Sequence, residues 1–412
     1  MFRAFFQVFA LLCGTAFLVA GSGLHGLLLP LRGGLEGFSL GALGFLGTAW
    51  AGGFITGCVL APRLVRRVGH VRAFSAFAST AAIIALLTGL FVEPTIWIAL
   101  RVLTGFAMAG AYMVIESWLN ERATNENRGQ IFGLYMVVNY AFIMGGQMIV
   151  AAGDLTSATL FMICGVFFSL SLIPTAISTA VSPKPLTQVS LDLPTLYRNS
   201  PVSFVSCVLI GIANGCFGTL GAVYGAGIGI ATTLIAFMMS ATVLGGALIQ
   251  IPVGRLSDKI DRRYVLASVA CAAAVAGLLI LLIEPRSATL ILILTGVYGG
   301  LSYALYPVAV AHANDYAQPE DFVKISSGLL LLYGFGTMIG PVLGALAMGY
   351  VRPEGLFLVT ALAHISITAH AIMRTRQRAS LPVEKKDTFA AGPPSRMATP
   401  ESVNLDPRAD QE

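Results

Sequence analysis

The chain has 412 residues, of which 56% are hydrophobic and only 11% are charged, and its formal net charge is +5. A soluble globular protein carries about 25% charged residues, so this composition excludes a soluble enzyme of one or two domains and predicts an integral membrane protein. The six Cys residues all lie in apolar segments and include no CxxC pair. We therefore expect neither a disulfide framework nor a metal site.

Apolar runs of about 20 residues, the length that a helix needs to cross the hydrocarbon core, recur along the whole chain. Charges, prolines and turn residues separate twelve of them, with predicted limits 5–30, 39–61, 73–92, 94–116, 129–152, 157–180, 201–224, 231–253, 264–283, 287–311, 323–349 and 354–373. The first run is longer than the apolar core of a signal peptide, so we expect it to remain as a span. The sequence thus predicts an all-α membrane protein with twelve spans.

The distribution of Lys and Arg predicts the orientation of these spans. If both termini are cytoplasmic, 21 of the 25 basic residues lie inside, and only Arg32, Arg286 and Arg352 lie outside. The remaining basic residue, Arg101, falls within the fourth span. Because cytoplasmic loops carry the excess of Lys and Arg, we predict a multi-pass protein of the cell (inner) membrane with both termini in the cytoplasm.

Short sequence matches at a nearly constant separation indicate an internal repeat. Glu93-Pro94 recurs as Glu284-Pro285, and Leu103-Thr104-Gly105 recurs as Leu294-Thr295-Gly296, both 191 residues later. Such self-similarity predicts two six-helix bundles, at residues 1–181 and 199–378. A polar, Pro-containing cytoplasmic linker is expected at 182–198, and the charged, Pro-rich segment 379–412 is predicted to be a disordered cytoplasmic tail.

Two loops and one span carry a resemblance to a known family. The segment GRLSDKIDRR (254–263) resembles the cytoplasmic signature Gly-x-x-x-Asp-Arg/Lys-x-Gly-Arg-Arg of the major facilitator superfamily, with Asp261 in place of the second Gly. The equivalent loop of the first half (62–72) keeps its basic residues but has Arg66 where the family has Asp. Arg101-x-x-x-Gly105 is similar to the intramembrane Arg motif of this family, and ESWLN (116–120) resembles the YcaD-like branch of bacterial permeases.

This resemblance implies the fold and the mechanism of the superfamily. Two six-helix bundles related by a pseudo-twofold axis would enclose a central cavity, which opens alternately to each side of the membrane. The repeat and the twelve predicted spans support the same architecture independently. The drug-antiporter branch has a Gly-Pro motif in its fifth span, where this chain has Gly145-Gly146-Gln147, so an antiporter of that kind is disfavoured.

Arg101 is the first candidate for a role in transport or coupling. It lies about 10 Å below the outer surface, counting about 1.5 Å per residue from Pro94, and a charge at that depth costs at least about 3 kcal/mol without a partner. The resemblance associates this position with proton transfer or with holding the first bundle together. The alternative is a structural Arg that donates to neighbouring carbonyl groups.

Glu116 is the second candidate and the only carboxylate expected within a span. Arg101 and Glu116 are 15 residues apart on one helix, about 60° from the same face, so both can face one cavity. Glu116 can either carry a proton or act as a solvated charge at the inner gate; the sequence favours the gate.

Several polar and aromatic residues of the spans are candidates for the cavity wall. Polar groups in apolar surroundings need partners, so each of them can equally be an interhelical hydrogen bond or a packed aromatic, and His25 lies close enough to the outer end of its span to be in water. The candidates are His25, Tyr112, Asn139, Gln147, Asn214, Tyr303 and Tyr306.

A stripe of small residues in the eleventh span predicts close helix packing. Residues without side chains let two backbones approach, and a proline bends the helix. The stripe consists of Gly336, Gly340, Pro341 and Gly344.

The cytoplasmic loops predict a gate with an inverted charge pattern. Asp258 is expected near the start of the fifth span, where a helix N-terminus attracts a carboxylate, with Arg262 and Arg263 of the signature beside it. In the other half, Arg66 with Arg63 or Arg67 is expected to pair with Asp315, Glu320 and Asp321. The alternative is that these arginines only follow the positive-inside bias.

These observations predict a secondary transporter, coupled to protons, that moves a small organic solute by alternating access. One fixed positive charge and few acids suit a neutral or anionic solute. The alternative is a non-transporting membrane sensor with a permease fold, although short loops and a short tail leave little room for a signalling domain. The absence of HExxH, of a paired Asp motif and of a Ser/His/Asp grouping argues against an enzyme. We expect a monomer that needs no cofactor and does not bind nucleic acid.

Overall fold

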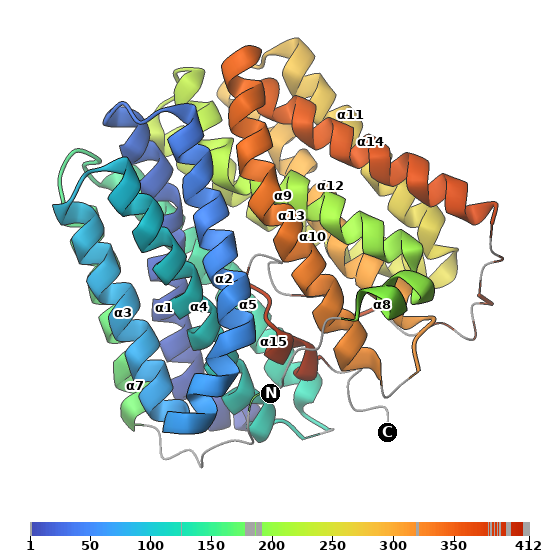
Figure 1. The fold of residues 1–412 in the computed structure, drawn as a ribbon, viewed down its shortest axis with the longest axis horizontal. Helices are drawn as coiled ribbons and strands as arrows, with labels where there is room; N and C mark the ends of the chain where they lie inside the picture. The colour runs from blue at the N-terminus through green and yellow to red at the C-terminus, as the bar shows by residue number, and fades with distance from the viewer. Residues whose placement is uncertain are drawn as a thin grey trace. The chain divides into compact units, whose positions relative to one another are not determined.

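The computed structural model describes residues 2–124, 126–177, 186, 192–318 and 321–377 and, in the tail, 379, 381–382, 384, 386, 389–392 and 397–406. Within this part of the chain, every regular element is a helix (Figure 1). Eleven helices are long and apolar enough to cross a membrane, and a twelfth apolar segment, Thr159–Thr175, is shorter. The all-α class and the sequence of spans are those predicted from the apolar runs.

The first six spans follow the predicted limits to within a few residues at most ends. They are α1 (Phe2–Leu35), α2 (Leu40–Val68), α3 (His70–Leu90), α4 (Pro94–Arg122), α5 (Arg128–Ala152), α6 (Thr159–Leu170) and α7 (Leu172–Ile177). The sixth span is divided between α6 and α7 at Ser171. Pro174 explains this break, because proline has no N–H to donate to the carbonyl of Leu170 and its ring crowds that carbonyl.

The second set of spans is preceded by a short helix, α8 (Leu193–Asn199), in the predicted linker. The spans themselves are α9 (Pro201–Gly227), α10 (Thr232–Lys259), α11 (Arg262–Ile283), α12 (Ala288–Asn314), α13 (Phe322–Tyr350) and α14 (Gly355–Thr375). Helices α2, α4 and α10 continue five or more residues beyond their predicted ends, through charged residues. A helix satisfies its backbone hydrogen bonds internally, so it does not stop where its apolar run stops.

The two copies of the Glu-Pro repeat have different structural roles. Glu93 is the N-cap of α4, and its carboxylate accepts a hydrogen bond from Ile96 N at 2.8 Å, with Pro94 in the first turn. Glu284 instead ends α11 with a left-handed backbone (φ 51°), and Ser287 caps α12. The repeat therefore marks the same loop in both halves, while the capping residue differs.

The chain forms two compact units. Unit 1 comprises residues 1–38, 49–189 and 397–412, and unit 2 comprises residues 39–48 and 190–396. Their main boundary falls in the predicted linker. Two segments depart from a simple division at that point, because the start of α2 belongs to unit 2 and the end of the tail belongs to unit 1. In unit 2, for example, Thr48 Oγ1 donates to Met338 O of α13 at 2.6 Å.

The small-residue stripe of α13 packs on α9 in unit 2. A Cβ atom at Gly336 would lie 2.1 Å from Val208 O, and one at Gly340 would lie 2.1 Å from Ile212 O. No side chain fits at such distances, so glycine is required for the two backbones to approach. Pro341 lies within α13 next to this contact, and Gly344 continues it toward Cys216 of α9.

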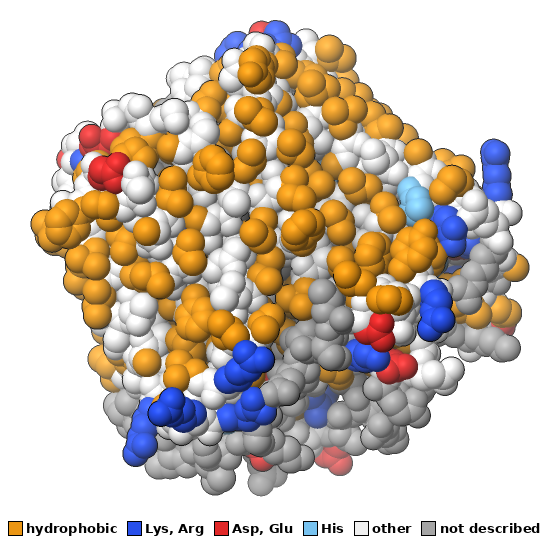
Figure 2. Space-filling model, in the orientation of Figure 1, with side chains coloured by type: hydrophobic (Ala, Val, Ile, Leu, Met, Phe, Trp, Pro, Cys, Tyr) orange, Lys and Arg blue, Asp and Glu red, His pale blue; other side chains and the backbone are white. Residues whose placement is uncertain are grey.

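The outward faces of the helices carry large apolar side chains. Figure 2 shows hydrophobic side chains over the helices, with Lys and Arg side chains near helix ends. Leu282 is 74% exposed and Leu248 is 60% exposed. Exposed apolar surface of this extent suits contact with lipid.

One part of the tail, residues 397–406, differs from the disordered segment that its composition predicts, while 380, 383, 385, 387–388, 393–396 and 407–412 lie outside the described residues. Residues 400–404 form α15 (Pro400–Asn404), and Thr399 caps it through a capping box with Ser402. This short helix contacts α4 in unit 1. Composition missed the segment because its order comes from a local helix-start signal, Thr-Pro-Glu-Ser, and from packing on a distant helix.

Candidate functional site

Glu116 lies in the most buried part of α4, where Ala107–Leu119 are buried without interruption. Its side chain is 0% exposed. Tyr135 Oη of α5 donates to Glu116 Oε1 at 2.7 Å, and Thr399 Oγ1 of the tail donates to Glu116 Oε2. The expectation of a solvated boundary charge is therefore wrong for this conformation, because both carboxylate oxygens are enclosed and accept O–H donors.

Tyr135 extends this contact along α5. Its backbone carbonyl accepts a hydrogen bond from Asn139 Nδ2 at 2.8 Å, and Asn139 is fully buried. Asn139 Oδ1 has no hydrogen-bond partner among the described residues. A buried acceptor without a donor costs about 1–3 kcal/mol, so this oxygen is a point where a donor from solute or water would be stabilised.

Arg101 is half-buried in α4. A charge this far below the membrane surface needs such contact with protein. Its guanidinium carbon lies 5.9 Å from the centroid of the Trp50 ring of α2, within the range of a cation–π interaction. Arg101 also lies close enough to His25 of α1 for a Coulombic interaction. The three helices α1, α2 and α4 thus meet at this cation in unit 1.

His25 is not in water, contrary to the expectation from its place in the first span. It is 2% exposed, and its ring packs edge-on against Phe161 at 6.3 Å between centroids. Neither ring nitrogen has a hydrogen-bond partner among the described residues. His25 is therefore a buried polar side chain of unit 1.

The other candidates of unit 1 are buried in the helix packing. Tyr112 is 0% exposed, with its ring 6.4 Å from that of Phe54. Gln147 of α5 is 8% exposed. Tyr112 has the environment of a packed aromatic, and Gln147 that of an interhelical polar group.

In unit 2, Asn214 belongs to a buried polar cluster that the sequence did not predict. Ser302 Oγ donates to Asn214 Oδ1 at 2.7 Å and lies 3.1 Å from His364 Nε2. Because the hydroxyl proton is directed to Asn214, His364 Nε2 is the donor to Ser302. This cluster joins α9, α12 and α14. It gives His364, for which the sequence predicts no role, a hydrogen-bond partner.

Tyr303 and Tyr306 lie on α12 in different surroundings. Tyr303 packs over Gly246 of α10, where an added Cβ would lie 2.9 Å from Tyr303 Cβ. The ring of Tyr306 lies 5.0 Å from that of Tyr333 of α13. Both are half-buried, and Tyr306 packs against the hydrophobic core of unit 2. Their place in a cavity wall stays a prediction.

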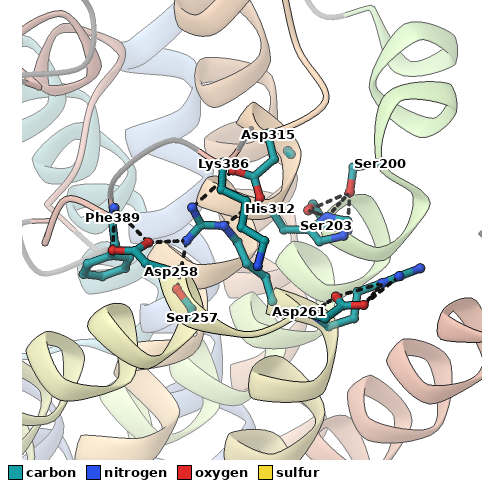
Figure 3. A network of polar contacts seen from close by, with 12 residues as sticks. Ser200, Ser203, Ser257, Asp258, Asp261, His312, Asp315, Lys386 and Phe389 are labelled. Carbon is teal, nitrogen blue, oxygen red and sulfur yellow. Dashed lines mark hydrogen bonds and ion pairs between the residues drawn. The ribbon is translucent and has the colours of Figure 1, made fainter. Parts of the chain in front are cut away.

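The signature segment 254–263 forms a buried ionic network around Arg262, which is 1% exposed. Arg262 Nε and Nη2 donate to the two carboxylate oxygens of Asp315 at 2.7 and 3.1 Å. Arg262 Nη1 donates to Ser257 Oγ at 2.8 Å and to Asp258 Oδ1 at 3.0 Å. Figure 3 shows Ser257, Asp258 and Asp315 directed toward this guanidinium. The bidentate geometry ties the α10–α11 turn to the end of α12.

Asp261, the residue that departs from the family signature, begins α11. Its carboxylate accepts from Arg263 N at 3.0 Å and from Arg263 Nη2 at 2.7 Å, while Arg263 Nη1 donates to Arg374 O of α14. Burial alone raises the pKa of Asp261, but the hydrogen bonds from the Arg263 side chain and backbone outweigh it and lower the pKa. As the N-cap, Asp261 supplies a side-chain acceptor to a backbone N–H of the first turn of α11, and a glycine has no side chain to do so.

Two of the predicted gate acids, Asp258 and Asp315, have partners within unit 2. Asp315 accepts from Arg262. Arg63, Arg66 and Arg67 are exposed at the end of α2, and their pairing with the acids before α13 stays a prediction. Asp258 is bound by Arg262 and by Phe389 N of the tail. Asp321 precedes α13 without a side-chain cap. Glu320 lies outside the described residues.

The sequence points to most of the candidate residues but not to the residues that they contact. Tyr135 and Thr399, which contact Glu116, are 19 and 283 residues away from it. Ser200, Ser203 and His312 form a second buried cluster of unit 2, in which His312 Nδ1 lies 2.8 Å from Ser200 Oγ (Figure 3). Ser200-Pro201 before an apolar run is a helix-start signal, and it was the one sequence clue to this cluster.

Comparison with known proteins identifies the class of this fold. A variant of the nucleoside transporter NupG has a TM-score of 0.72 at 14% identity, over 88% of this chain and 98% of that one. A bacterial homologue of the human lysosomal transporter Spinster, in an inward-facing and unoccupied conformation, has a TM-score of 0.69 at 14% identity, over 90% and 94%. These structures show that the fold is that of the major facilitator transporters.

Sequence comparison points to the same class of protein. The family model of the Major Facilitator Superfamily matches residues 202–399. The MFS-type transporter YcaD of Salmonella arizonae is 28% identical over 355 residues, which cover 85% of this chain and 91% of that protein. Both sequence comparisons support a multi-pass membrane transport protein of the major facilitator type, and the chain is similar to YcaD, as the motifs in 101–120 and 254–263 predicted.

Proposed function

We propose that this chain is a secondary transporter that moves a small organic solute by alternating access and couples the movement to protons. The observation that carries the proposal is the environment of Glu116. It is the one carboxylate among the described residues that is buried inside a membrane-spanning helix, away from the helix ends. A buried ionisable group inside a membrane is costly and is retained for function.

The surroundings of Glu116 support proton transfer rather than a fixed ion pair. No cation is within salt-bridge distance of its carboxylate among the described residues; its side-chain partners there are the hydroxyl groups of Tyr135 and Thr399. Such partners can serve a carboxylate as donors and a carboxylic acid as acceptors. With Tyr135 as a hydroxyl partner, Glu116 can therefore keep a hydrogen bond in both its protonated and its deprotonated form.

Arg101 supports a preference for the solute. It is the one basic residue within the hydrophobic part of a span, and it is held by the Trp50 ring in unit 1. We propose that it attracts an anionic or a polar neutral solute and excludes cations. Asn139 Oδ1 supplies an acceptor on α5 for a donor group of the same solute.

Orientation and assembly complete the proposal. The positive-inside bias supports cytoplasmic termini in the cell (inner) membrane. Each unit has its own buried core, and we propose that a monomer suffices for transport.

Uptake into proteoliposomes tests this function. The purified chain is reconstituted and given a mixture of nucleosides, hexoses, amino acids and monocarboxylates, with and without a pH gradient, and the internal compounds are quantified by mass spectrometry. We expect at least one class to accumulate above protein-free liposomes, and more strongly with the gradient. Equal uptake by liposomes with and without protein, in both gradient directions, contradicts the proposal.

A further inference from the structure

We infer that the C-terminal tail is an autoinhibitory strap, which keeps the transporter inactive while it occupies Glu116. This inference rests on the proposed function, because it concerns the same carboxylate. Two tail segments carry it: an inner segment, of which residues 386 and 389–392 are described, bound within unit 2, and an outer segment, residues 397–406, bound within unit 1.

The outer segment is bound in unit 1 as a core element would be. Thr399 and Leu405 are 0% exposed, and Met397, Glu401 and Ser402 are at most 5% exposed. Arg128 Nη1, at the start of α5, donates to Asn404 O at 2.8 Å. The segment therefore has a hydrogen bond at each end, at Thr399 and at Asn404, with buried side chains between them.

Thr399 links the structure of the segment to the candidate coupling residue. Its Oγ1 accepts from Glu401 N at 3.2 Å, as the cap of α15, and donates its proton to Glu116 Oε2. One hydroxyl thus starts the tail helix and also occupies the second oxygen of Glu116. Because Glu116 is 0% exposed, exchange of its proton with solute or water requires Thr399 to leave.

The inner segment is bound to the signature motif in unit 2. Phe389 N donates to Asp258 Oδ1 at 3.0 Å, Lys386 Nζ donates to Ile260 O at 2.6 Å, and Gly392 N donates to Gln250 Oε1 at 3.3 Å. Figure 3 shows Phe389 beside Asp258. The Phe389 ring fills the position of a missing side chain at Gly254, where a Cβ would lie 2.1 Å from it.

The two anchors are joined by only four residues, 393–396. A short connection makes binding of the second anchor intramolecular once the first is bound, which raises its occupancy without further contacts. It also limits how far the two anchors can separate while both remain bound, since a residue spans at most about 3.6 Å. Alternating access requires the bundles to move relative to one another, so release of one anchor is expected to precede transport.

Thiol labelling measures tail docking without any solute. Ala398 is 6% exposed, so in Ala398→Cys the new thiol is expected to react slowly with an impermeant maleimide, measured above the labelling of the parent chain. Adding Thr399→Val, which keeps the shape of the side chain and removes the donor to Glu116, is expected to raise the rate about tenfold, the effect of losing one hydrogen bond to a charged group. Thr375→Val is the control, because the Thr375 hydroxyl donates to Ile372 O within α14, and it should leave the rate unchanged.

The same variants separate docking from inhibition. In proteoliposomes given the metabolite mixture above, Thr399→Val, Phe389→Ala and a chain ending at Leu381 are each expected to take up solute several times faster than wild type, with Thr375→Val at the wild-type rate. Fast labelling of Ala398→Cys in the otherwise wild-type chain overturns docking. Faster labelling with unchanged uptake in all three variants overturns inhibition, and uptake absent from every variant overturns the proposed function while the labelling result stands.

Discussion

At the scale of residues, function is concentrated in a few buried polar groups whose partners are distant in the sequence. Glu116, Arg101 and Arg262 were each visible in the sequence as charges or motif positions. Their partners Tyr135 and Trp50 were not, and Asp315 was expected to pair with Arg66 and not with Arg262. Contacts between helices depend on rotation and crossing and leave no local pattern. The sequence therefore predicts which side chains need a partner, and the fold decides which partner they have.

Arg101→Lys is expected to lose most of the transport activity. A planar guanidinium can stack on Trp50 and still donate from its edges to buried acceptors, and an ammonium cannot do both. At equal amounts of folded protein, we expect at least about a tenfold loss of uptake, equivalent to about 1.4 kcal/mol. Wild-type uptake in Arg101→Lys would mean that charge alone is required, and loss of folded protein would assign Arg101 a structural role.

Asp315→Asn is expected to destabilise the chain strongly. Arg262 and Asp315 are 1% and 3% exposed, and removal of one member of such a buried pair costs about 3–5 kcal/mol. Glu36→Gln is the matched control, because the Arg32–Glu36 pair at 2.6 Å is more exposed and is worth only about 0–1 kcal/mol. Thermal unfolding in detergent should show a much larger loss of Tm for Asp315→Asn, and equal losses would refute the network.

At the scale of elements, the apolar runs predicted the position of the helices, because the thickness of the hydrocarbon fixes their minimum length. They did not predict the extensions of α2, α4 and α10, where polar residues continue the helix. The sequence contains Pro174, but a proline alone does not predict a break such as the one at Ser171. The prolines within α2, α10, α12 and α13 leave those four helices continuous. The order of residues 397–406 was missed because composition averages over a short capping signal.

The glycines of α13 and α5 allow a test of close packing between helices. Gly340→Ala places a Cβ against Ile212 O of α9, and overpacking of this kind costs about 1–3 kcal/mol. Gly145→Ala in α5 meets no atom within 4 Å, so it should be neutral or slightly stabilising. Thermal unfolding of the two variants compares them directly, and an equal effect would contradict the role of the stripe.

At the scale of the whole molecule, the charge distribution makes a definite prediction of topology. Val92, between α3 and α4, and Gln377, after α14, are exposed, uncharged and on opposite sides in the predicted orientation. Gln377→Cys should react with an impermeant thiol reagent only from the cytoplasmic side, and Val92→Cys only from outside. The reverse pattern would contradict the predicted orientation.

Proton coupling through Glu116 is tested most directly in Glu116→Gln, by comparing solute accumulation driven by a pH gradient with solute exchange. Exchange of internal for external solute needs no net proton movement, whereas accumulation driven by a pH gradient needs a group that gains and loses a proton. With any solute that wild type accumulates in proteoliposomes, we predict that Glu116→Gln keeps exchange and loses the gradient-driven accumulation. Accumulation at the wild-type level in Glu116→Gln would contradict the assignment of Glu116 as the proton-coupling residue.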